Sequence, residues 1–255
     1  VLLSCAKTMS AVSKVKVPLT TSPRFQKEAA EIALQMSQFS VDELERLLRV
    51  NAKIAVENYK RYQAFHAETT PELPALLAYT GIVFKRLNPK DFSAEDFGYA
   101  QEHLRLTSFC YGLLRPLDVI RAYRLEGDVV LPELGNQTLF SYWRSRLTDT
   151  FIEDIRSAGG ILCNLASDEM KSLFDWKRVE SEVRVVTPEF HVWKNGKLAT
   201  IVVYTKMSRG EMTRFILKNK IGNPEELKGF SWEGFEFDES LSDERKLVFI
   251  NGMGE

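Results

Sequence analysis

Residues 199–220 read ATIVVYTKMSRGEMTRFILKNK, and the predicted fold is worked out from this stretch. Residues 200–204 are rich in β-branched and aromatic side chains, a pattern typical of a buried strand. Residues 211–220 carry apolar side chains at helical spacing. Ser208 and Glu211 have the spacing of a capping box at the start of that helix. The stretch therefore predicts a strand, a cationic turn and a helix, in that order.

Lys206 and Arg209 lie in this turn, and Gly210 falls in the first turn of the predicted helix. The unpaired N–H groups and the positive dipole end of a helix favour an anion, and two cationic side chains add to that attraction. The pattern indicates a phosphate or carboxylate site. The alternative is a solvated turn with surface lysine and arginine.

Two other short apolar strands, residues 1–5 and 161–163, also end in polar loops. The polar side chains that follow them are Lys7 and Thr8 after the first strand, and Asn164 and Ser167 after the second. Ligands of open α/β sheets bind beyond the carboxyl ends of strands, so we expect the three loops to line one cleft. Arg115 and Arg124 are expected to add positive charge to it.

The rest of the chain alternates helical and extended patterns, which predicts an α/β (mixed α+β) fold with a mixed sheet, as a single domain over residues 1–255. Helices are predicted within residues 24–66, from 93 and over 136–155, and strands over 184–193 and 246–250. Ser40 with Glu43 and Ser93 with Asp96 have capping-box spacing, and Asn51 is a third predicted helix cap. Residues 80–82 suggest a turn into an extended segment, and residues 194–197 a β-hairpin. Residues 107–118 fit a buried strand or a helix-hairpin-helix link.

The composition excludes several function classes. The chain has 34 Lys and Arg against 35 Asp and Glu, so its net charge of −1 gives no general attraction to nucleic acid or anionic membranes. No apolar run approaches the ~20 residues that a membrane-spanning helix needs, and we expect a cytoplasmic protein. The three cysteines are far apart, which favours reduced thiols over a disulfide framework or a zinc site.

Cofactor and catalytic motifs are also missing from the sequence. His66, His103 and His191 are isolated, and His103 is expected to pack on the apolar face of its helix. There is no GxSxG, Walker or GxGxxG pattern. We therefore expect no metal site and no bound cofactor, and no catalytic residue is assigned.

Several motifs, taken together and in order, resemble the YaaA family of bacterial peroxide stress resistance proteins. They are SCAKTM at 4–9, QEHLRL at 101–106, YGLLRPLD at 111–118, AYRLE at 122–126, CNLASDE at 163–169, YTKMSRGEMTRFI at 204–216 and GFSWEGFEF at 229–237. The resemblance implies a mixed α/β domain that limits free-iron damage and binds double-stranded DNA through a cationic cleft and a helix-hairpin-helix. The family's basic positions correspond to Lys7, Arg115, Arg124, Lys206 and Arg209.

The chain departs from the family pattern at three places. Cys5 stands where the family usually has proline, and Phe109 replaces a hairpin glycine that would let the backbone approach a phosphate. Met207 and Ser208 follow Lys206 where the family often reads Lys-Lys-Ala-Arg-Gly, so one cation is missing. We therefore expect DNA binding to be weaker than in the family and sensitive to salt.

Two function classes remain open. In the first, the cations grip the DNA backbone. In the second, the chain is an enzyme that holds a phosphorylated or carboxylated small molecule with the same cations, and Lys7 or Lys206 takes part in the chemistry. A wide groove favours the first class and an enclosed pocket the second. A third reading pairs the cations internally with Asp118, Glu126 and Asp168.

Overall fold

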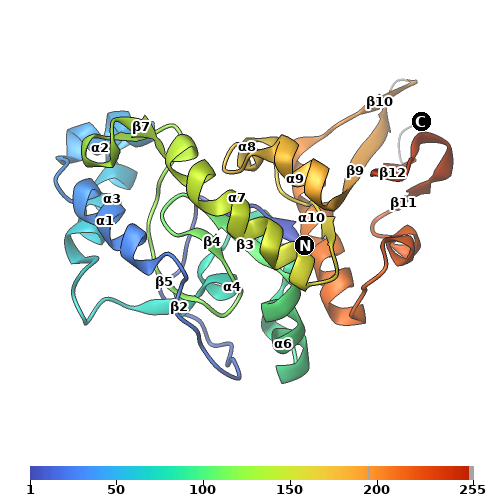
Figure 1. Cartoon of the computed structure of the whole chain (residues 1–255), viewed down its shortest axis with the longest axis horizontal. Coiled ribbons are helices and arrows are strands. Elements are labelled where there is room, and N and C mark those ends of the chain that lie inside the picture. The colour runs from blue at the N-terminus through green and yellow to red at the C-terminus, as the bar shows by residue number, and fades with distance from the viewer. Residues whose placement is uncertain (195, 253–255) are drawn as a thin grey trace.

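Two β-sheets meet near the middle of the chain's α/β fold, which confirms the predicted fold class (Figure 1). The computed structural model describes residues 1–194 and 196–252. The first sheet has the order β1 (Leu2–Leu3), β3 (Arg105–Ser108), β4 (Gly112–Leu114). In the second, β8 (Ile161–Cys163) pairs with β9 (Arg184–Lys194), which continues to β10 (Lys197–Ala199) on one side and to β12 (Lys246–Asn251) and β11 (Phe235–Asp238) on the other.

The sheets are joined where the ends of β1 and β8 lie side by side. β1 is parallel to β3, β8 is parallel to β9, and Leu2 forms a parallel bridge with Asn164 just beyond β8. Parallel neighbours present their carboxyl ends at one edge. The two polar loops predicted after these strands are therefore neighbours, as expected.

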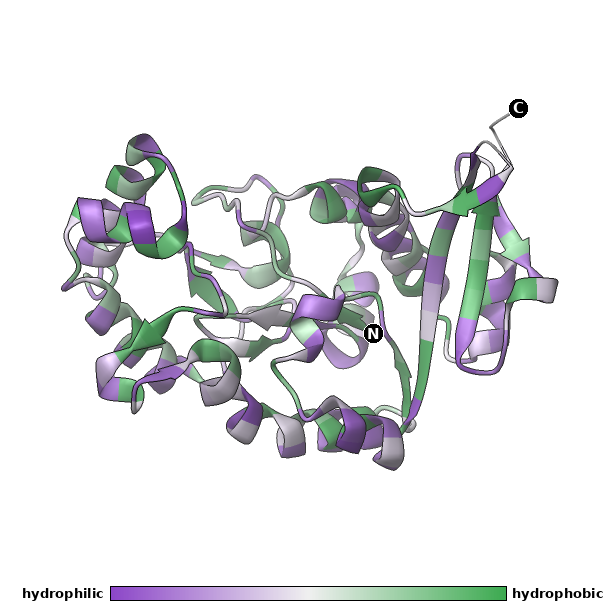
Figure 2. Ribbon diagram, turned by 90° about the horizontal axis from the view of Figure 1, so that it is seen from above, coloured by the Kyte–Doolittle hydropathy of each residue, from purple (hydrophilic) through white to green (hydrophobic). Residues whose placement is uncertain are grey.

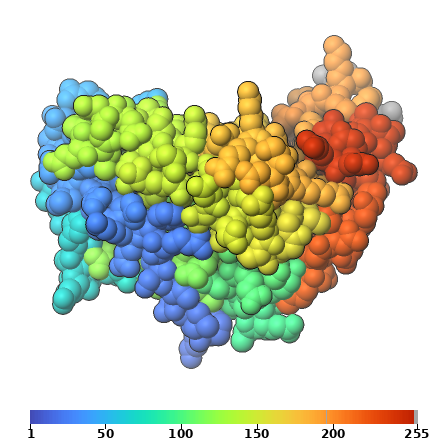
Figure 3. Space-filling model, viewed as in Figure 1, coloured from blue at the N-terminus to red at the C-terminus, as the bar shows by residue number. Residues whose placement is uncertain are grey.

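Helices cover the sheets and close one end of the molecule. The N-terminal helices α1 (Gln26–Met36), α2 (Val41–Leu48) and α3 (Ala52–Ala64) form the end drawn in blue in Figure 1. The long helix α7 (Leu139–Ser157) runs from that end across the face seen in the space-filling view (Figure 3). The other α-helices are α4 (Ala75–Ala78), α5 (Ile82–Leu87), α6 (Ala94–His103), α8 (Asp168–Lys171), α9 (Trp176–Glu182) and α10 (Val202–Asn219).

Short elements complete the fold. Two small antiparallel sheets pair β2 (Glu72–Pro74) with β5 (Val119–Arg121) and β6 (Val130–Leu131) with β7 (Gln137–Thr138). Single 3₁₀ turns are η1 (Pro89–Asp91), η2 (Pro132–Leu134), η3 (Pro224–Gly229) and η4 (Glu239–Leu241). Local sequence signals set several of these boundaries. Ser40 and Ser93 each cap a helix in a capping box, as predicted from their spacing to Glu43 and Asp96.

The strand predicted over residues 200–204 is wrong. Helix α10 begins at Val202 and continues through residues 206–210, so Ser208 is a buried residue inside the helix and not its cap. Val202, Val203 and Tyr204 of the suggested strand lie in the exposed first turn of α10. The preference of β-branched residues for strands is weak where they do not pack in a sheet. Here the packing of α10 on α5 favours the helix.

Two further predictions are corrected. Residues 82–87 form helix α5 and not an extended segment. For residues 107–118 the buried-strand alternative is confirmed and the helix-hairpin-helix alternative is wrong, because β3 and β4 form an antiparallel hairpin of buried strands in the described chain. Phe109 explains the hairpin, because its side chain is buried and its carbonyl accepts the indole N–H of Trp143 at 2.8 Å.

The predicted hairpin at residues 194–197 lies partly outside the described residues, because Asn195 is not described. Lys194 and Lys197 on either side pair in antiparallel register, in line with the prediction.

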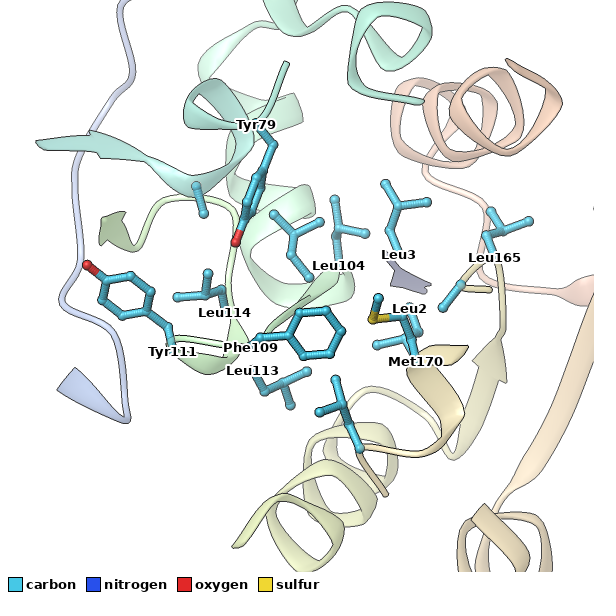
Figure 4. Close-up of a cluster of buried hydrophobic side chains, with 14 of the residues drawn as sticks. Leu2, Leu3, Tyr79, Leu104, Phe109, Tyr111, Leu113, Leu114, Leu165 and Met170 are labelled. Atoms are coloured by element: carbon cyan, nitrogen blue, oxygen red, sulfur yellow. The ribbon is translucent and has the colours of Figure 1, made fainter. Parts of the chain in front are cut away.

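The core is continuous across the first sheet and the helices around it. Figure 4 shows Phe109 within a cluster that includes Leu2, Leu104, Leu113 and Met170, which come from separate parts of the chain. Helices alternate hydrophobic and hydrophilic residues along their length, as expected of helices with one buried face (Figure 2).

A buried carboxylate fastens the end of α10 to α6. Asp96 is 5% exposed, its side chain accepts a hydrogen bond of 2.9 Å from Lys218, and it also forms an ion pair with Lys220. Burial raises the pKa of Asp96, but the hydrogen bonds from Lys220 and Lys218 outweigh it and hold that pKa well below its usual range.

We expect Asp96→Asn to lower the free energy of unfolding at pH 7 by about 2 kcal/mol, because it leaves two lysines without their partner, although both are partly exposed to water. The folded-state pKa lies below the 3.8 of a free aspartate. The contribution is therefore complete above that value and is lost as pH falls through the folded-state pKa. Urea unfolding at pH 7 and at pH 3 measures it. A difference between variant and wild type that grows on acidification would contradict the assignment.

Candidate anion-binding cavity

A cavity of about 320 Å³ lies where the two loops after β1 and β8 face helix α10. We call it the anion cavity. Its walls come from residues 3–8, 81–84 and 123–125, together with Phe109, Leu165, Ser167, Glu169, Met170, Lys206 and Arg209. Six of the eight predicted site residues line it, namely Lys7, Thr8, Arg124, Ser167, Lys206 and Arg209. Segments up to two hundred residues apart in sequence thus form one site.

The two strand-end loops are tied to each other by hydrogen bonds. The Ser4 hydroxyl accepts the backbone N–H of Ser167 at 2.9 Å. The backbone N–H of Cys5 donates to the Thr107 hydroxyl on β3 at 3.2 Å. These bonds hold residues 4–8 across the end of the first sheet, where Lys7 and Thr8 reach the cavity.

The third wall is a helix face and not the predicted turn. Lys206 and Arg209 are three residues apart in α10, a spacing that places both on one face. Gly210 brings α10 close to α5, because a Cβ on this residue would lie 2.3 Å from the carbonyl oxygen of Val83. The close helix contact therefore positions the two cations at the cavity.

Two other cations of the cavity share one buried carboxylate. The Lys7 ammonium lies 2.6 Å from Glu126, and the Arg124 guanidinium lies 3.7 Å from the other oxygen of the same side chain. The Glu126 side chain is 7% exposed, against 58% for Lys7. The reading in which cations pair internally therefore holds for Lys7 and Arg124.

Arg209 differs from these cations. Within residues 1–194 and 196–252, no carboxylate forms an ion pair with Arg209 or Lys206, and Asp168 instead pairs with Lys171 at 2.7 Å. The Nε of Arg209 is buried and has no acceptor. Burial lowers the pKa of Arg209, and the nearby Asp168 opposes this only in part. A half-buried guanidinium without a partner favours a bound anion.

Arg115 and Asn164 are the two predicted residues that do not line the cavity. Arg115 forms an ion pair with Asp118 at 2.9 Å and donates to the carbonyl of Ser22 at 3.2 Å, so it braces a loop elsewhere. Asn164 is buried behind the cavity wall, where its side-chain oxygen accepts the N–H of Ala166 at 3.2 Å. Among the described residues, its side-chain nitrogen has no acceptor.

The apolar part of the wall was missed at the sequence level. Leu3, Phe84, Leu125, Leu165 and Met170 line the cavity beside Phe109 and Tyr123. Leu3 falls in a predicted apolar strand and Phe109 in the segment that fits a buried strand, but core and cavity wall are indistinguishable in such a pattern. Glu169 also lines the cavity, next to Asp168 in the motif that supplied Ser167.

Tyr123 is fixed by a buried network of hydroxyl groups. Its hydroxyl lies 2.7 Å from that of Tyr79 and 2.7 Å from that of Ser108. Burial raises the pKa of Tyr123 well above its usual range, so it is neutral at physiological pH. The network makes this wall rigid.

The structure also bears on three other expectations, which concern metal sites, membrane spans and His103. Among the described residues, no group of three or more His, Cys, Asp and Glu side chains is placed to hold a metal ion. None of the described helices is long and apolar enough to cross a bilayer. His103 stacks on Tyr99 with ring centroids 3.9 Å apart, which confirms its predicted packing role.

The cavity contains a thiol that we expect to be unreactive. Burial raises the pKa of Cys5 to about 12, and burial does the same for Cys163. The thiolate is the reactive form, so at pH 8 only a small fraction of either residue is available. We expect Ellman's reagent to titrate few of the three cysteines in the folded protein within minutes, and all three in urea. Rapid reaction of Cys5, located by peptide mapping, would contradict this assignment.

Comparison with known proteins identifies relatives over the whole chain. A family model described as peroxide stress protein YaaA matches residues 1–241. A UPF0246 protein of Bacteroides fragilis is 78% identical over 255 residues, which cover 100% of this chain and 99% of the relative. UPF0246 proteins of Phocaeicola vulgatus and Crocosphaera subtropica are 64% and 38% identical, with 97% and 98% of each chain covered.

Proposed function

The chain belongs to the family of the peroxide stress protein YaaA, and from this premise we propose that it binds double-stranded DNA non-specifically at the anion cavity. In this proposal the protein acts in the bacterial cytoplasm and limits the damage that free iron and peroxide cause to DNA. The cations contact backbone phosphates and make little base readout.

One observation carries the proposal: Lys206 and Arg209 lie on one helix face at the cavity without a carboxylate partner in the described chain. Phosphate oxygens would supply the missing acceptors, and guanidinium–phosphate hydrogen bonds are among the strongest in proteins. Lys7 is 58% exposed, so it can reach a second phosphate while Glu126 retains Arg124.

Counterion displacement links DNA binding to iron. Divalent iron is drawn to DNA by the negative charge of the phosphates, and a protein that neutralises phosphates releases the cations condensed there. Binding would thus lower the amount of iron held where peroxide produces radicals next to the bases. This route needs no metal ligands in the protein.

A salt series tests the proposal. Fluorescence anisotropy of a labelled duplex is expected to show binding that weakens with salt, with a log–log slope of about −2 to −4 for two to four phosphate contacts. Duplexes of different sequence are expected to bind alike. Lack of binding at low salt, or a slope near zero, would refute DNA binding through these cations.

A second function is favoured by the shape of the site. The cavity is walled on several sides and has an apolar lining, as pockets for small ligands have. An enzyme acting on a phosphorylated or carboxylated small molecule would hold the anionic group on the cations of the cavity, with Lys7 or Lys206 taking part in proton transfer. Thermal shifts with inorganic phosphate and simple carboxylates test it. A ligand that raises the melting temperature of wild type but not of Arg209→Ala would favour this function.

A further inference from the structure

The anion cavity is too small for a duplex, and it is not shaped for a bare phosphate. Its volume of about 320 Å³ lies at the lower end of the range of small-ligand pockets, roughly 300–1,000 Å³. Cationic side chains and an apolar wall both line this space. We infer that the cavity holds one nucleotide at a time, with the phosphate on the cations and the base against the apolar wall. This inference rests on the proposed DNA binding, which would supply the nucleotide from the duplex.

The wall residues match the needs of a base. Leu3, Leu165 and Met170 present aliphatic surface, and Phe109 and Tyr123 contribute aromatic rings. A base turned out of a helix loses its stacking partners and regains them between aromatic or apolar side chains. The apolar wall lies directly beside the cations, so both parts of a nucleotide can bind at once.

The cations match the phosphate. Arg209 and Arg124 both line the cavity, and both have a buried Nε without an acceptor in the described chain. The negative charge of Glu126 balances the positive charge of Arg124 but not that of Arg209. A phosphate on Arg209 and Lys206 would supply the charge that the protein itself leaves out.

Polar groups beside the wall can read the edge of a base. Glu169 lines the cavity with a carboxylate, and Ser167 and Thr8 offer hydroxyl groups there. A planar ring with donors and acceptors on its edge uses such groups, whereas a fatty acid or a simple sugar phosphate does not use them together with an aromatic wall. The chemistry therefore points to a nucleotide.

The test uses a duplex that carries 2-aminopurine, whose fluorescence rises when it leaves the base stack. One duplex is fully paired, and a second places the probe opposite a mismatch, because an unpaired base leaves the stack at lower free-energy cost. Anisotropy of a dye at the duplex end reports binding separately. Isothermal titration with free deoxyadenosine monophosphate reports a nucleotide taken from solution.

The variant Ala6→Leu adds bulk at a partly exposed residue of the lining and removes none of the four cationic side chains. Ala52→Leu adds the same atoms on the exposed first turn of α3, away from the cavity, and serves as the size-matched control. Thermal unfolding verifies that both variants are folded.

For wild type and Ala52→Leu we expect a fluorescence rise of at least about twofold on the mismatched duplex. In Ala6→Leu the fluorescence rise should be lost, while the affinity for the duplex, measured by anisotropy, changes by less than about threefold. Binding of free deoxyadenosine monophosphate that Ala6→Leu abolishes also supports the inference, and then identifies solution as the source of the nucleotide.

Wild type that binds the duplex without a fluorescence rise, and that ignores the free nucleotide, overturns the inference and leaves DNA binding standing. Lack of duplex binding refutes the proposed function. The titration of wild type with free deoxyadenosine monophosphate then shows by itself whether the cavity holds a nucleotide. If Ala6→Leu unfolds, the two wild-type measurements still decide between these outcomes.

Discussion

Gly210→Ala is expected to destabilise the protein by about 3 kcal/mol, although alanine is the better helix former by about 1 kcal/mol. A Cβ at this position would lie 2.3 Å from the carbonyl oxygen of Val83 and 2.8 Å from the Cβ of Arg86. The first of these is a backbone atom of α5, so the contact is relieved only by moving one helix away from the other. The free energy of unfolding in urea measures the effect.

Gly98→Ala is the matched control, because Gly98 lies inside helix α6 and a Cβ there would meet no atom within 4 Å. This variant should be more stable than wild type by up to about 1 kcal/mol, since only helix propensity acts. The two substitutions are chemically identical and should have opposite signs. Equal stabilisation by both would mean that α10 does not pack on α5 as described.

Arg209→Ala is expected to weaken duplex binding by about tenfold or more, since a hydrogen bond to a charged group contributes roughly 1.5–3 kcal/mol and 1.4 kcal/mol is a factor of ten. The log–log salt slope should become shallower by about 1, because one phosphate contact is lost. Anisotropy across a salt series gives both quantities. The loss should be alike for all duplex sequences, as expected of a backbone contact.

Two variants control this experiment. Lys53→Ala removes an exposed cation of α3 that does not line the cavity, and we expect duplex binding within about twofold of wild type. Arg209→Lys keeps the charge but loses the planar guanidinium, so it should retain the wild-type slope with reduced affinity. If Lys53→Ala and Arg209→Ala weaken binding equally, the attraction is general and the cavity is not the site.

The sequence predicted correctly those elements that depend on residues close to one another in the chain. The capping boxes at Ser40 and Ser93 and the cap at Asn51 each place a helix start correctly, because a cap depends on residues three positions apart. Strand β9 was also predicted, since its alternating burial follows from its own sequence. The sequence also predicted that Lys7 and Ser167 line one cleft, because ligands of open α/β sheets bind beyond the carboxyl ends of the strands.

Predictions were wrong mainly where contacts between residues distant in sequence determine the structure. Ser208 and Glu211 have capping-box spacing, yet the helix begins at Val202 because α10 packs along α5. Arg115 matches a basic position of the family, but Asp118 is nearby in the chain and binds it. Phe109 was judged as a lost hairpin glycine, whereas it is a core residue under β3 and β4. The packing of α10 on α5 and the burial of Phe109 depend on residues that are distant in sequence. The pair of Arg115 with Asp118 is local, and it is one of the internal pairings that the sequence leaves open as a third reading.

The pairing of β1 with β3 and its bridge to Asn164 have a consequence for biosynthesis. The first residues of the chain find their sheet partners only after more than one hundred further residues have been made, and the cations of α10 arrive some forty residues after Asn164. Contacts of such long sequence separation form slowly, because loop closure precedes any gain from pairing. A nascent chain still attached to the ribosome would therefore carry Lys7 and Thr8 without the rest of their site. Competence to bind would appear abruptly, once α10 has been made, and no N-terminal fragment ending before residue 206 would inherit it.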